Sequence, residues 1–252
     1  MRVSVIVSTY NWPEALGAVL RSLVDQSIAP YEVIVADDGS GPSTKSVVNA
    51  FDGVRHVWHS DDGFRLAEIR NKALIEASGD WVVFLDGDCV CPPWFIEQQI
   101  RLADESKMLA GNRRLLTPSE SESFLKHQRT VNEFIRESGA KKLGVWPGVF
   151  YRDWMPKKWQ KVRGCNIGVF RSAALAIGGF DESYQGWGKE DSDFAARAIN
   201  AGLNIRLGQH AVSVLHLYHP EADRSALENN EARLADVLAT NRTKPVRSLL
   251  TR

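Results

Sequence analysis

Two aspartates, Asp86 and Asp88, end an apolar run in the segment FLDGDC and are separated by one glycine. Residues two apart in an extended chain project to the same side, so both carboxylates would face one partner. Gly87 between them would let a bulky ligand approach the backbone. Oxygen ligands of this kind suit Mg²⁺ or Mn²⁺, which keep positions for phosphate oxygens and water. The spacing therefore predicts a divalent-cation site, and an ordinary Asp-Gly turn is the alternative.

A second acidic group lies in the segment GWGKEDSDF, residues 186–194. Apolar residues recur after it at helical spacing, so Glu190 and Asp191 fall in the first turn of a predicted helix. The helix dipole favours the ionised carboxylate there, and such a group can accept the proton of an attacking sugar hydroxyl. Trp187 offers a flat apolar face for a sugar ring. An acidic helix start beside a core tryptophan is the alternative.

The N-terminal half alternates strand and helix patterns. Four short apolar runs, continuous enough to be buried on both faces, are predicted as strands: Val3–Val7, Glu32–Ala36, Arg55–Trp58 and Trp81–Leu85. A helix is predicted between the first two runs, with Asn11 as its cap and Pro13 in its first turn. A second helix is predicted between the last two. This βαβ repetition predicts an α/β fold with a Rossmann-like, mainly parallel sheet flanked by helices.

Ligands of such sheets bind beyond the carboxyl ends of the strands, where this chain is polar. Six aspartates would crowd that edge: Asp37, Asp38, Asp61, Asp62, Asp86 and Asp88. Like charges so close raise one another's pKa unless cations or hydrogen-bond donors compensate, and a divalent metal is one answer. The segment DDGS also resembles the phosphoacceptor pocket of a receiver domain. A domain of that kind, about 120 residues long, would leave half of the chain unexplained.

Composition excludes several classes of protein. The 31 basic and 31 acidic residues give a formal net charge of zero, so the overall charge indicates no nucleic-acid partner. Cys89, Cys91 and Cys165 are too few for a disulfide framework, and their spacing matches no structural zinc finger. A cytoplasmic location is therefore expected. No apolar run approaches the roughly 20 residues of a spanning helix, so any contact with the inner face of a membrane would be peripheral.

Five segments, taken in order, resemble family-two glycosyltransferases of the GT-A fold: VSVIVSTYNWPEAL, VIVADDGS, RNKALIEASGDWVVFLDGDC, RGCNIGVFR and GWGKEDSDF. In particular, they are similar to the transferase domains of bacterial hyaluronan and chondroitin polymerases. The likeness covers residues 2–112 and 162–220. It implies a single catalytic domain at 1–220, with a nucleotide-sugar-binding half at 1–112 and an acceptor-binding half at 113–220. A helical tail would follow at 221–252.

The resemblance also implies roles for individual residues. The donor nucleotide sugar would contact Ser8, Tyr10, Asn11, Asp38, Arg65, Arg70, Asn71 and Asp86. The acceptor would be held by Trp187, Gly188 and Glu190, and Asp191 would be the catalytic base. Asp88 would bind the metal together with a histidine late in the sheet. His219 is favoured because the strand gives way to a loop there, and His216 is the other candidate.

The activity implied is that of an inverting, metal-dependent glycosyltransferase. It would move a sugar from a nucleotide donor, expected to be a UDP-sugar, to a glycan or lipid-linked glycan of a bacterial surface polysaccharide such as lipopolysaccharide, with Mn²⁺ or Mg²⁺ as cofactor. The alternative is a catalytically silent nucleotide-sugar or glycan-binding module of the same fold. Lys189 replaces the small residue of many relatives and is expected to alter the acceptor pocket.

Two further segments suit contacts with ligands. Aromatic and basic residues alternate in the unmatched segment 113–163, which suits a glycan acceptor or anionic lipid headgroups, with a solvated loop as the alternative: Trp146, Trp154, Trp159, Lys141, Lys142, Lys157, Lys158, Lys161 and Arg163. The tail is predicted to form an amphipathic helix through Leu227, Leu234, Val237 and Leu238. Its basic end could touch a membrane surface weakly.

Overall fold

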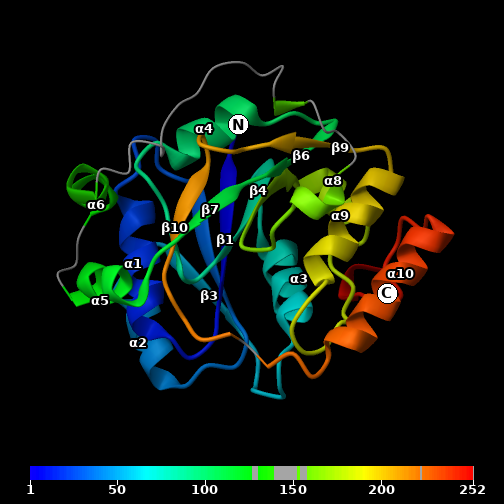
Figure 1. The fold of residues 1–252 in the computed structure, drawn as a ribbon, viewed down its shortest axis with the longest axis horizontal. Coiled ribbons are helices and arrows are strands. Elements are labelled where there is room, and N and C mark those ends of the chain that lie inside the picture. The colour runs from blue at the N-terminus through cyan, green and yellow to red at the C-terminus, as the bar shows by residue number, and fades with distance from the viewer. Residues whose placement is uncertain (127–129, 139–151, 154–157, 222, 252) are drawn as a thin grey trace.

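The computed structural model describes residues 1–126, 130–138, 152–153, 158–221 and 223–251. A seven-stranded sheet with helices on both faces forms its centre (Figure 1). The strand order is β3-β2-β1-β4-β8-β6-β9, with these bounds: β1 (Val3–Thr9), β2 (Glu32–Asp37), β3 (Val54–Trp58), β4 (Trp81–Asp86), β6 (Lys107–Ala110), β8 (Asn166–Phe170) and β9 (Asn204–Leu207). Only β8 is antiparallel to its neighbours. The predicted mainly parallel α/β sheet is confirmed.

Helices from the two halves of the chain cover the sheet. Their bounds are α1 (Pro13–Val24), α2 (Pro42–Asn49), α3 (Leu66–Glu76), α4 (Phe95–Leu102), α5 (Pro118–Lys126), α6 (Val131–Ser138), α8 (Arg171–Ala176), α9 (Glu190–Asn200) and α10 (Leu227–Thr240), with short 3₁₀ helices η1 (Trp159–Lys161) and η2 (Leu249–Thr251). In Figure 1, α1 and α2 lie on one side of the central strands, and α3 and α9 lie on the other.

Alternation along β1 explains this layering, because successive strand residues point to opposite faces. Val5 and Val7 belong to the core cluster that contains the apolar residues of α1. Ile6 belongs to the cluster that contains those of α3 and α9. β1 is buried along its whole length, as predicted. The prediction that β3 is buried on both faces is wrong, because β3 is an edge strand whose residues are half-buried or exposed.

The start of α1 differs from the prediction in one respect. Pro13 occupies the first turn as expected, but the capping position belongs to Trp12, which makes no side-chain cap hydrogen bond. Asn11 instead has a left-handed backbone (φ 46°). Its side-chain oxygen accepts the N–H of Gly41 at 2.9 Å, and its own N–H donates to Ser40 Oγ at 2.8 Å. Asn11 therefore joins the loop after β1 to the loop after β2.

A smaller sheet brings the second half of the chain to the Asp86–Asp88 turn. It contains β5 (Cys89–Val90), β10 (Ser213–His216) and β7 (Asn112–Leu115), in the order β5-β10-β7. β10 is antiparallel to β5, and His216 is paired with Cys89. This register places a histidine from near the end of the fold beside Asp88.

The tail is bound to the domain along most of its described length. Leu234 and Val237 of α10 are buried in a cluster with Ala196 of α9. The N–H groups of Val246 and Leu249 donate to the Asp181 and Glu182 carboxylates at 2.6 and 2.8 Å. The predicted helix is confirmed, but Leu238, predicted to lie on its apolar face, is 40% exposed. The domain boundary at residue 220 stays a prediction. No helix in the described part of the chain is long and apolar enough to cross a membrane.

Two glycines give opposite expectations for the same substitution. A Cβ on Gly168 of β8 would lie 2.5 Å from Gln99 Oε1 and 2.6 Å from the Trp81 ring, so Gly168→Ala should lower the free energy of unfolding by about 1–3 kcal/mol. A Cβ on Gly17 of α1 would meet the flexible end of Arg21 at 3.4 Å. Gly17→Ala should therefore raise stability by about 0.5–1 kcal/mol. Urea denaturation tests the pair, and equal effects would contradict this account of the packing.

Candidate active site

Arg70 of α3 lies at the centre of the site. Its side chain is only 1% exposed. One terminal nitrogen donates to Asp86 at 2.8 Å and the other donates to Glu190 at 3.2 Å. Its Nε donates to Ser8 Oγ at 3.1 Å, and the Gly164 carbonyl accepts a further bond at 3.2 Å. Because protein groups take up this guanidinium, Arg70 ties the ends of β1 and β4 to the start of α9.

Burial changes the protonation of the two carboxylates that contact Arg70. Burial raises the pKa of Asp86; Arg70 counteracts this shift and Asp88 adds to it. Burial also raises the pKa of Glu190 to about 7, and the charge of Asp191 adds to the effect while that of Arg70 opposes it. Glu190 can therefore gain or lose a proton near neutral pH, the range in which general bases work best.

Asp191 lies next to Glu190 but in different surroundings. Its Oδ2 accepts the backbone N–H of Gly164 at 2.7 Å, and its Oδ1 accepts that of Ser192 at 2.6 Å. Its side chain is half-buried, whereas Glu190 is only 9% exposed. The N–H donors hold Asp191 as an oriented acceptor. Of the two carboxylates, Asp191 is the one that solvent can reach more readily.

Asp88 faces both predicted histidines. Its Oδ2 lies 3.3 Å from Nε2 of His219 and 3.6 Å from Nε2 of His216. Burial would raise the pKa of Asp88, but the hydrogen bond from His219 and the charges of both histidines outweigh it and lower the pKa. The bond to Asp88 raises the pKa of His219 to about 9, while burial lowers that of His216. The structure therefore brings together the three predicted metal ligands.

These residues fit a divalent cation. The Nδ1 of His219 lies 2.7 Å from the Pro220 carbonyl oxygen, so Nδ1–H donates there and Nε2 faces Asp88, as in many metal-ligating histidines. Ligand atoms of Asp88, Cys89 and His216 all lie within 4.8 Å of one another. Burial raises the pKa of the Cys89 thiol, which keeps it protonated and a poor ligand for Mn²⁺ or Mg²⁺. Asp88 with the two histidines is the donor set that fits.

Gly87 has a different role from the predicted one. A Cβ at this position would lie 2.8 Å from the Ser8 carbonyl oxygen, which also accepts the Gly87 N–H at 2.7 Å. The glycine is therefore required by the close approach of the β1 backbone. The prediction of an extended Asp-Gly-Asp segment is also wrong, because β4 ends at Asp86 and a turn follows.

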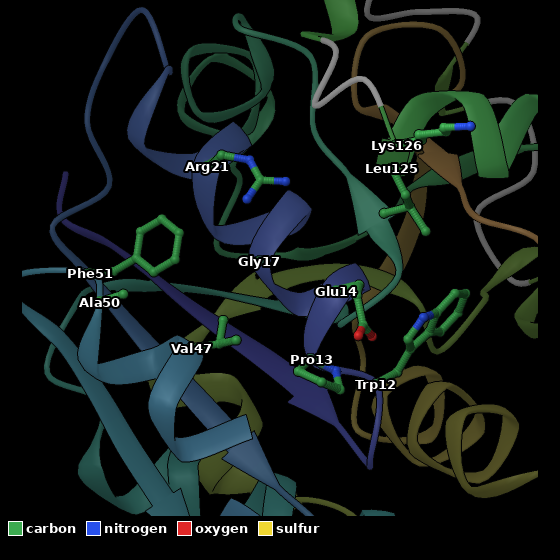
Figure 2. A pocket seen from close by; sticks show the side chains of 10 residues that line it. All are labelled: Trp12, Pro13, Glu14, Gly17, Arg21, Val47, Ala50, Phe51, Leu125 and Lys126. Carbon is green, nitrogen blue, oxygen red and sulfur yellow. The ribbon is translucent and has the colours of Figure 1, made fainter. Parts of the chain in front are cut away.

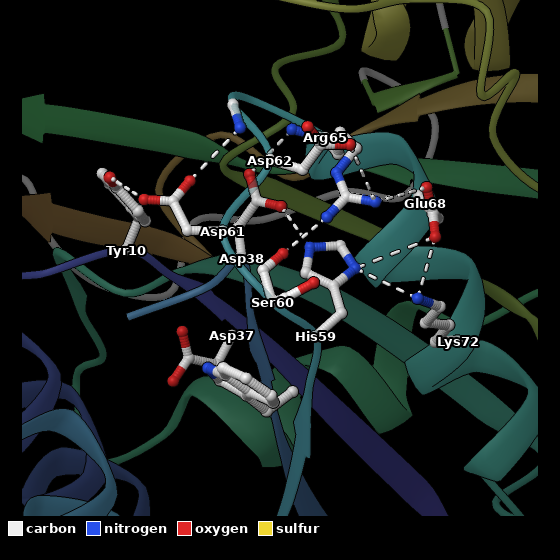
Figure 3. Close-up of polar contacts among 12 residues, drawn as sticks. Tyr10, Asp37, Asp38, His59, Ser60, Asp61, Asp62, Arg65, Glu68 and Lys72 are labelled. Carbon is white, nitrogen blue, oxygen red and sulfur yellow. Dashed lines mark hydrogen bonds and ion pairs between the residues drawn. The ribbon is translucent and has the colours of Figure 1, made fainter. Parts of the chain in front are cut away.

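The six predicted aspartates do not surround one cation. Asp37 and Asp38 are paired with separate histidines, His56 at 2.8 Å and His59 at 2.6 Å. Asp61 accepts the Tyr10 hydroxyl at 2.9 Å (Figure 3). Asp62, at 82% side-chain exposure, lies in solvent near Arg65. Protein groups thus compensate most of these charges, and only Asp88 has a metal-binding environment.

The predicted donor-binding residues differ in how accessible they are to a ligand. Tyr10 follows β1 and is 52% exposed, so its ring is accessible to solvent. Asp38 is buried beside the backbone of Arg65, whose side chain is held by the Ser60 carbonyl oxygen at 2.6 Å. Asn71 is not part of this group, because it is fully buried and its amide contacts both the N–H and the carbonyl of Phe180. Asn71 therefore joins α3 to the second half of the chain.

The acceptor side also differs in detail from the prediction. Trp187 is 38% exposed, but the Arg224 guanidinium lies over its ring at 5.2 Å and covers one face. Gly188 has a backbone φ of 109°, which favours glycine. Lys189 caps α9 and its Nζ lies 3.2 Å from Glu231 of α10. This contact with the tail helix does not test the expectation that Lys189 alters the acceptor pocket, which stays a prediction.

Only part of the aromatic and basic segment falls within the described residues. Trp159 packs against the cluster of α9 and α10. Arg163 donates to the carbonyl oxygens of Gln160 and Val162 at 3.0 and 3.2 Å. Lys158 and Lys161 belong to or border η1, and the other predicted residues of this set lie outside the described residues. An acceptor role for this segment stays a prediction.

A separate pocket of about 640 Å³ lies along α1 (Figure 2). It is lined by Trp12, Pro13, Glu14, Gly17, Arg21, Val47, Ala50, Phe51, Leu125 and Lys126. None of the predicted site residues lines it. Its wall meets the candidate metal site at one point, where the Trp12 ring stands edge-on to His219 at 6.2 Å. The candidate site described above lies at the ends of β1 and β4 and the start of α9, and not in this pocket.

Sequence comparison establishes the family. The model of the family described as "Glycosyl transferase family 2" matches residues 4–172, so the chain belongs to that family. A second model, "N-terminal domain of galactosyltransferase", matches residues 149–220. The chain is 28% identical over 252 residues to the chondroitin synthase of Escherichia coli, covering 91% of this chain and 36% of that protein. It thus spans about a third of that relative, and the predicted likeness to such polymerases is confirmed.

Structural comparison confirms the GT-A fold. Staphylococcus aureus TarS superimposes with a TM-score of 0.67 at 19% identity, covering 96% of this chain and 65% of that one. The mannosyltransferase PcManGT of Pyrobaculum calidifontis, solved with GDP-Man and Mn²⁺, gives a TM-score of 0.60 at 21% identity and covers 93% and 61% of the two chains. At these identities the likeness shows the fold alone.

Two further polar residues near the site were not predicted. His59 follows β3 directly and contacts Asp38, and a histidine at a strand end was a signal that could have identified it. Arg113 of β7 is half-buried and its charge lowers the pKa of His216, after the larger effects of burial and Asp88. Its position depends on the register of the small sheet, for which the sequence offers no signal.

Removal of Arg70 should leave two carboxylates without their cationic partner. Arg70→Met is expected to lower the free energy of unfolding by about 3–5 kcal/mol, because it leaves Asp86 and Glu190 without their cation. In a Glu190→Gln background the same change should cost at least about 1 kcal/mol less. Urea denaturation of the four proteins measures the coupling. Arg55→Met is the matched control, since Arg55 is 41% exposed and its loss should cost less than about 1 kcal/mol.

Proposed function

We infer that the chain is an inverting, metal-dependent glycosyltransferase that moves a sugar from a UDP-sugar to a hydroxyl group of a glycan or lipid-linked glycan. The observation that carries the proposal is the position of Asp191. Its carboxylate is held by the N–H groups of Gly164 and Ser192, and Arg70 joins the neighbouring Glu190 to Asp86, two residues before Asp88. On this basis the cation site at Asp88 would take the leaving group, and Asp191 would take the attacking hydroxyl.

In the proposed reaction, Asp191 accepts the proton of the acceptor hydroxyl as that oxygen attacks the donor sugar. Attack displaces the nucleotide directly and inverts the anomeric centre, so no protein nucleophile is required. A base in this position contributes roughly 10²- to 10⁴-fold in rate. Glu190 lies beside Asp191 and has a pKa of about 7. Its bond to Arg70 holds the start of α9 in place, and its carboxylate would help to hold the acceptor.

Asp88, His216 and His219 would hold the cation, and a bound Mn²⁺ or Mg²⁺ would neutralise the charge that grows on the departing diphosphate. The choice of Mn²⁺ rests on the imidazole ligands, which suit a borderline metal. PcManGT, a protein of the same fold, was solved with Mn²⁺. Asp86 immediately precedes the same turn and is bonded to Arg70. It would contact the donor sugar rather than the metal.

The choice of a UDP-sugar rests on the crevice and on the fold. The exposed Tyr10 ring can stack on a base, and Asp38 lies at the adjacent strand end. TarS was solved with UDP and with UDP-GlcNAc. The acceptor we propose is a bacterial surface glycan, with the residues at 1–112 binding the donor and those at 113–220 binding the acceptor.

Asp191→Asn should abolish most of the activity and leave donor binding unchanged. We expect slow, metal-dependent release of nucleotide from one donor in a panel of UDP-, GDP- and dTDP-sugars, and a fall of about 10²-fold or more in the variant. Coupled detection of free nucleoside diphosphate measures the rate. Asp52→Asn is the matched control, because Asp52 is exposed and remote from the crevice. A donor that binds without any turnover, with acceptor glycans present, would favour the silent binding module.

Metal binding should depend on Asp88 and the histidines. In calorimetric titrations with Mn²⁺ in the presence of UDP, Asp88→Asn should remove detectable binding, and His219→Gln should weaken it by about tenfold or more. His216→Gln tests the second ligand in the same way. Unchanged Mn²⁺ affinity in all three variants would contradict the proposed metal site. Asp52→Asn again provides the control, since it removes one exposed carboxylate elsewhere.

A further inference from the structure

The Asp38 carboxylate at the end of β2 is held from two sides (Figure 3). His59 Nε2 lies 2.6 Å from Asp38 Oδ1, and the backbone N–H of Arg65 donates to Oδ2 at 2.9 Å. The side chains of Asp38 and His59 are only 5% and 6% exposed. Since a carboxylate oxygen can accept two hydrogen bonds, each Asp38 oxygen keeps one acceptor position for a ligand.

Lys72 determines which nitrogen of His59 carries the proton. Its Nζ lies 3.1 Å from His59 Nδ1, and an ammonium group can only donate. Nδ1 is therefore an acceptor, and the proton of the neutral ring lies on Nε2, from which it is donated to Asp38. Glu68 holds Lys72 in place at 2.8 Å and lies 3.9 Å from His59 Nδ1. The order Glu68, Lys72, His59, Asp38 forms a directed chain of contacts.

Burial raises the pKa of Asp38, and the hydrogen bonds from His59 and from the Arg65 N–H reduce that rise, so both of these contacts favour the ionised form. An ionised carboxylate is an acceptor only, so it complements a nucleobase that presents a ring N–H. Uracil has such a donor at N3, whereas N3 of cytosine is an acceptor. A site built to bond a donor strongly rejects the analogue that lacks it.

We propose that His59 is a positioning residue: with its tautomer fixed by Lys72, it orients the Asp38 carboxylate toward the donor's base and makes the site select uracil over cytosine. The proposal rests on the proposed function, because it requires a nucleotide donor in this crevice. The exposed ring of Tyr10, held by its hydroxyl on Asp61 at 2.9 Å, provides an adjacent surface for stacking a base.

The test is calorimetric titration of the full chain, in Mn²⁺, with UDP and with CDP. The wild-type protein should bind UDP at least about tenfold more tightly than CDP. His59→Phe keeps a ring of similar size but removes the donor, and it should reduce that preference to less than about threefold. Lys72→Met should reduce it as well, since the ring is then free to change tautomer. Lys72→Arg keeps a cationic donor and is the matched control, which should retain the preference.

The pH dependence separates positioning from a merely structural role. The charged groups around His59 are Asp38, Glu68, Lys72 and Arg65. Loss of the His59 donor should raise the pKa of Asp38 further. Once protonated, Asp38 no longer offers both of its oxygens as acceptors for the N–H of the base. As pH falls from about 8 to about 5, the UDP affinity of His59→Phe should therefore decline at a higher pH than that of the wild type.

Each outcome decides one point. A UDP preference and pH midpoint unchanged in both His59→Phe and Lys72→Met overturns the role of His59. Equal wild-type affinity for UDP and CDP also overturns it, and leaves the transferase proposal intact. If the wild-type protein binds no nucleoside diphosphate, the proposed function fails and this inference fails with it. Lys72 is 31% exposed, so its variants remain informative if His59→Phe does not fold.

Discussion

A buried cation, Arg70, is the interaction on which the rest of the site depends. The ends of β1 and β4 and the first residue of α9 all place polar groups on this guanidinium. The separate elements cannot relax apart without leaving Glu190 charged in a buried position and the half-buried Asp86 without its cation, which is costly. The stacked and edge-on rings of Phe84, Phe180 and Phe194 lie directly beneath, and Phe180 contacts the guanidinium. These contacts hold the start of α9 in place and therefore position Glu190 and Asp191.

Most of the aspartates at this edge of the sheet have a separate partner that compensates their charge. Asp37 and Asp38 have histidines, Asp86 has Arg70, and Asp61 has a tyrosine hydroxyl. This arrangement leaves Asp88, with two histidines and a protonated thiol around it, as the carboxylate whose surroundings suit a divalent cation.

Contacts between distant segments make the site and the tail parts of one unit. The small sheet carries His216 to the Asp86–Asp88 turn, and Asn71 of α3 contacts Phe180, Glu182 and Ser248. The chain end thus supports the helix that carries Arg70. The position of α3 in the candidate site therefore depends in part on Ser248, which lies outside the segments that resemble the family.

The sequence by itself determined the parallel core and the types of residue at its edge, because these depend on short-range patterns. Continuous apolar runs predicted β1, β2 and β4, and carboxylates after a strand and at a helix start made Asp88, Glu190 and Asp191 candidate site residues. Only the tertiary structure decided which charges meet. Arg70 bonds Asp86 and Glu190, which lie 16 and 120 residues away, and His59 contacts Asp38 through the register of β2 and β3. Such contacts are set by strand order and helix packing, so they cannot be predicted from local patterns in the sequence.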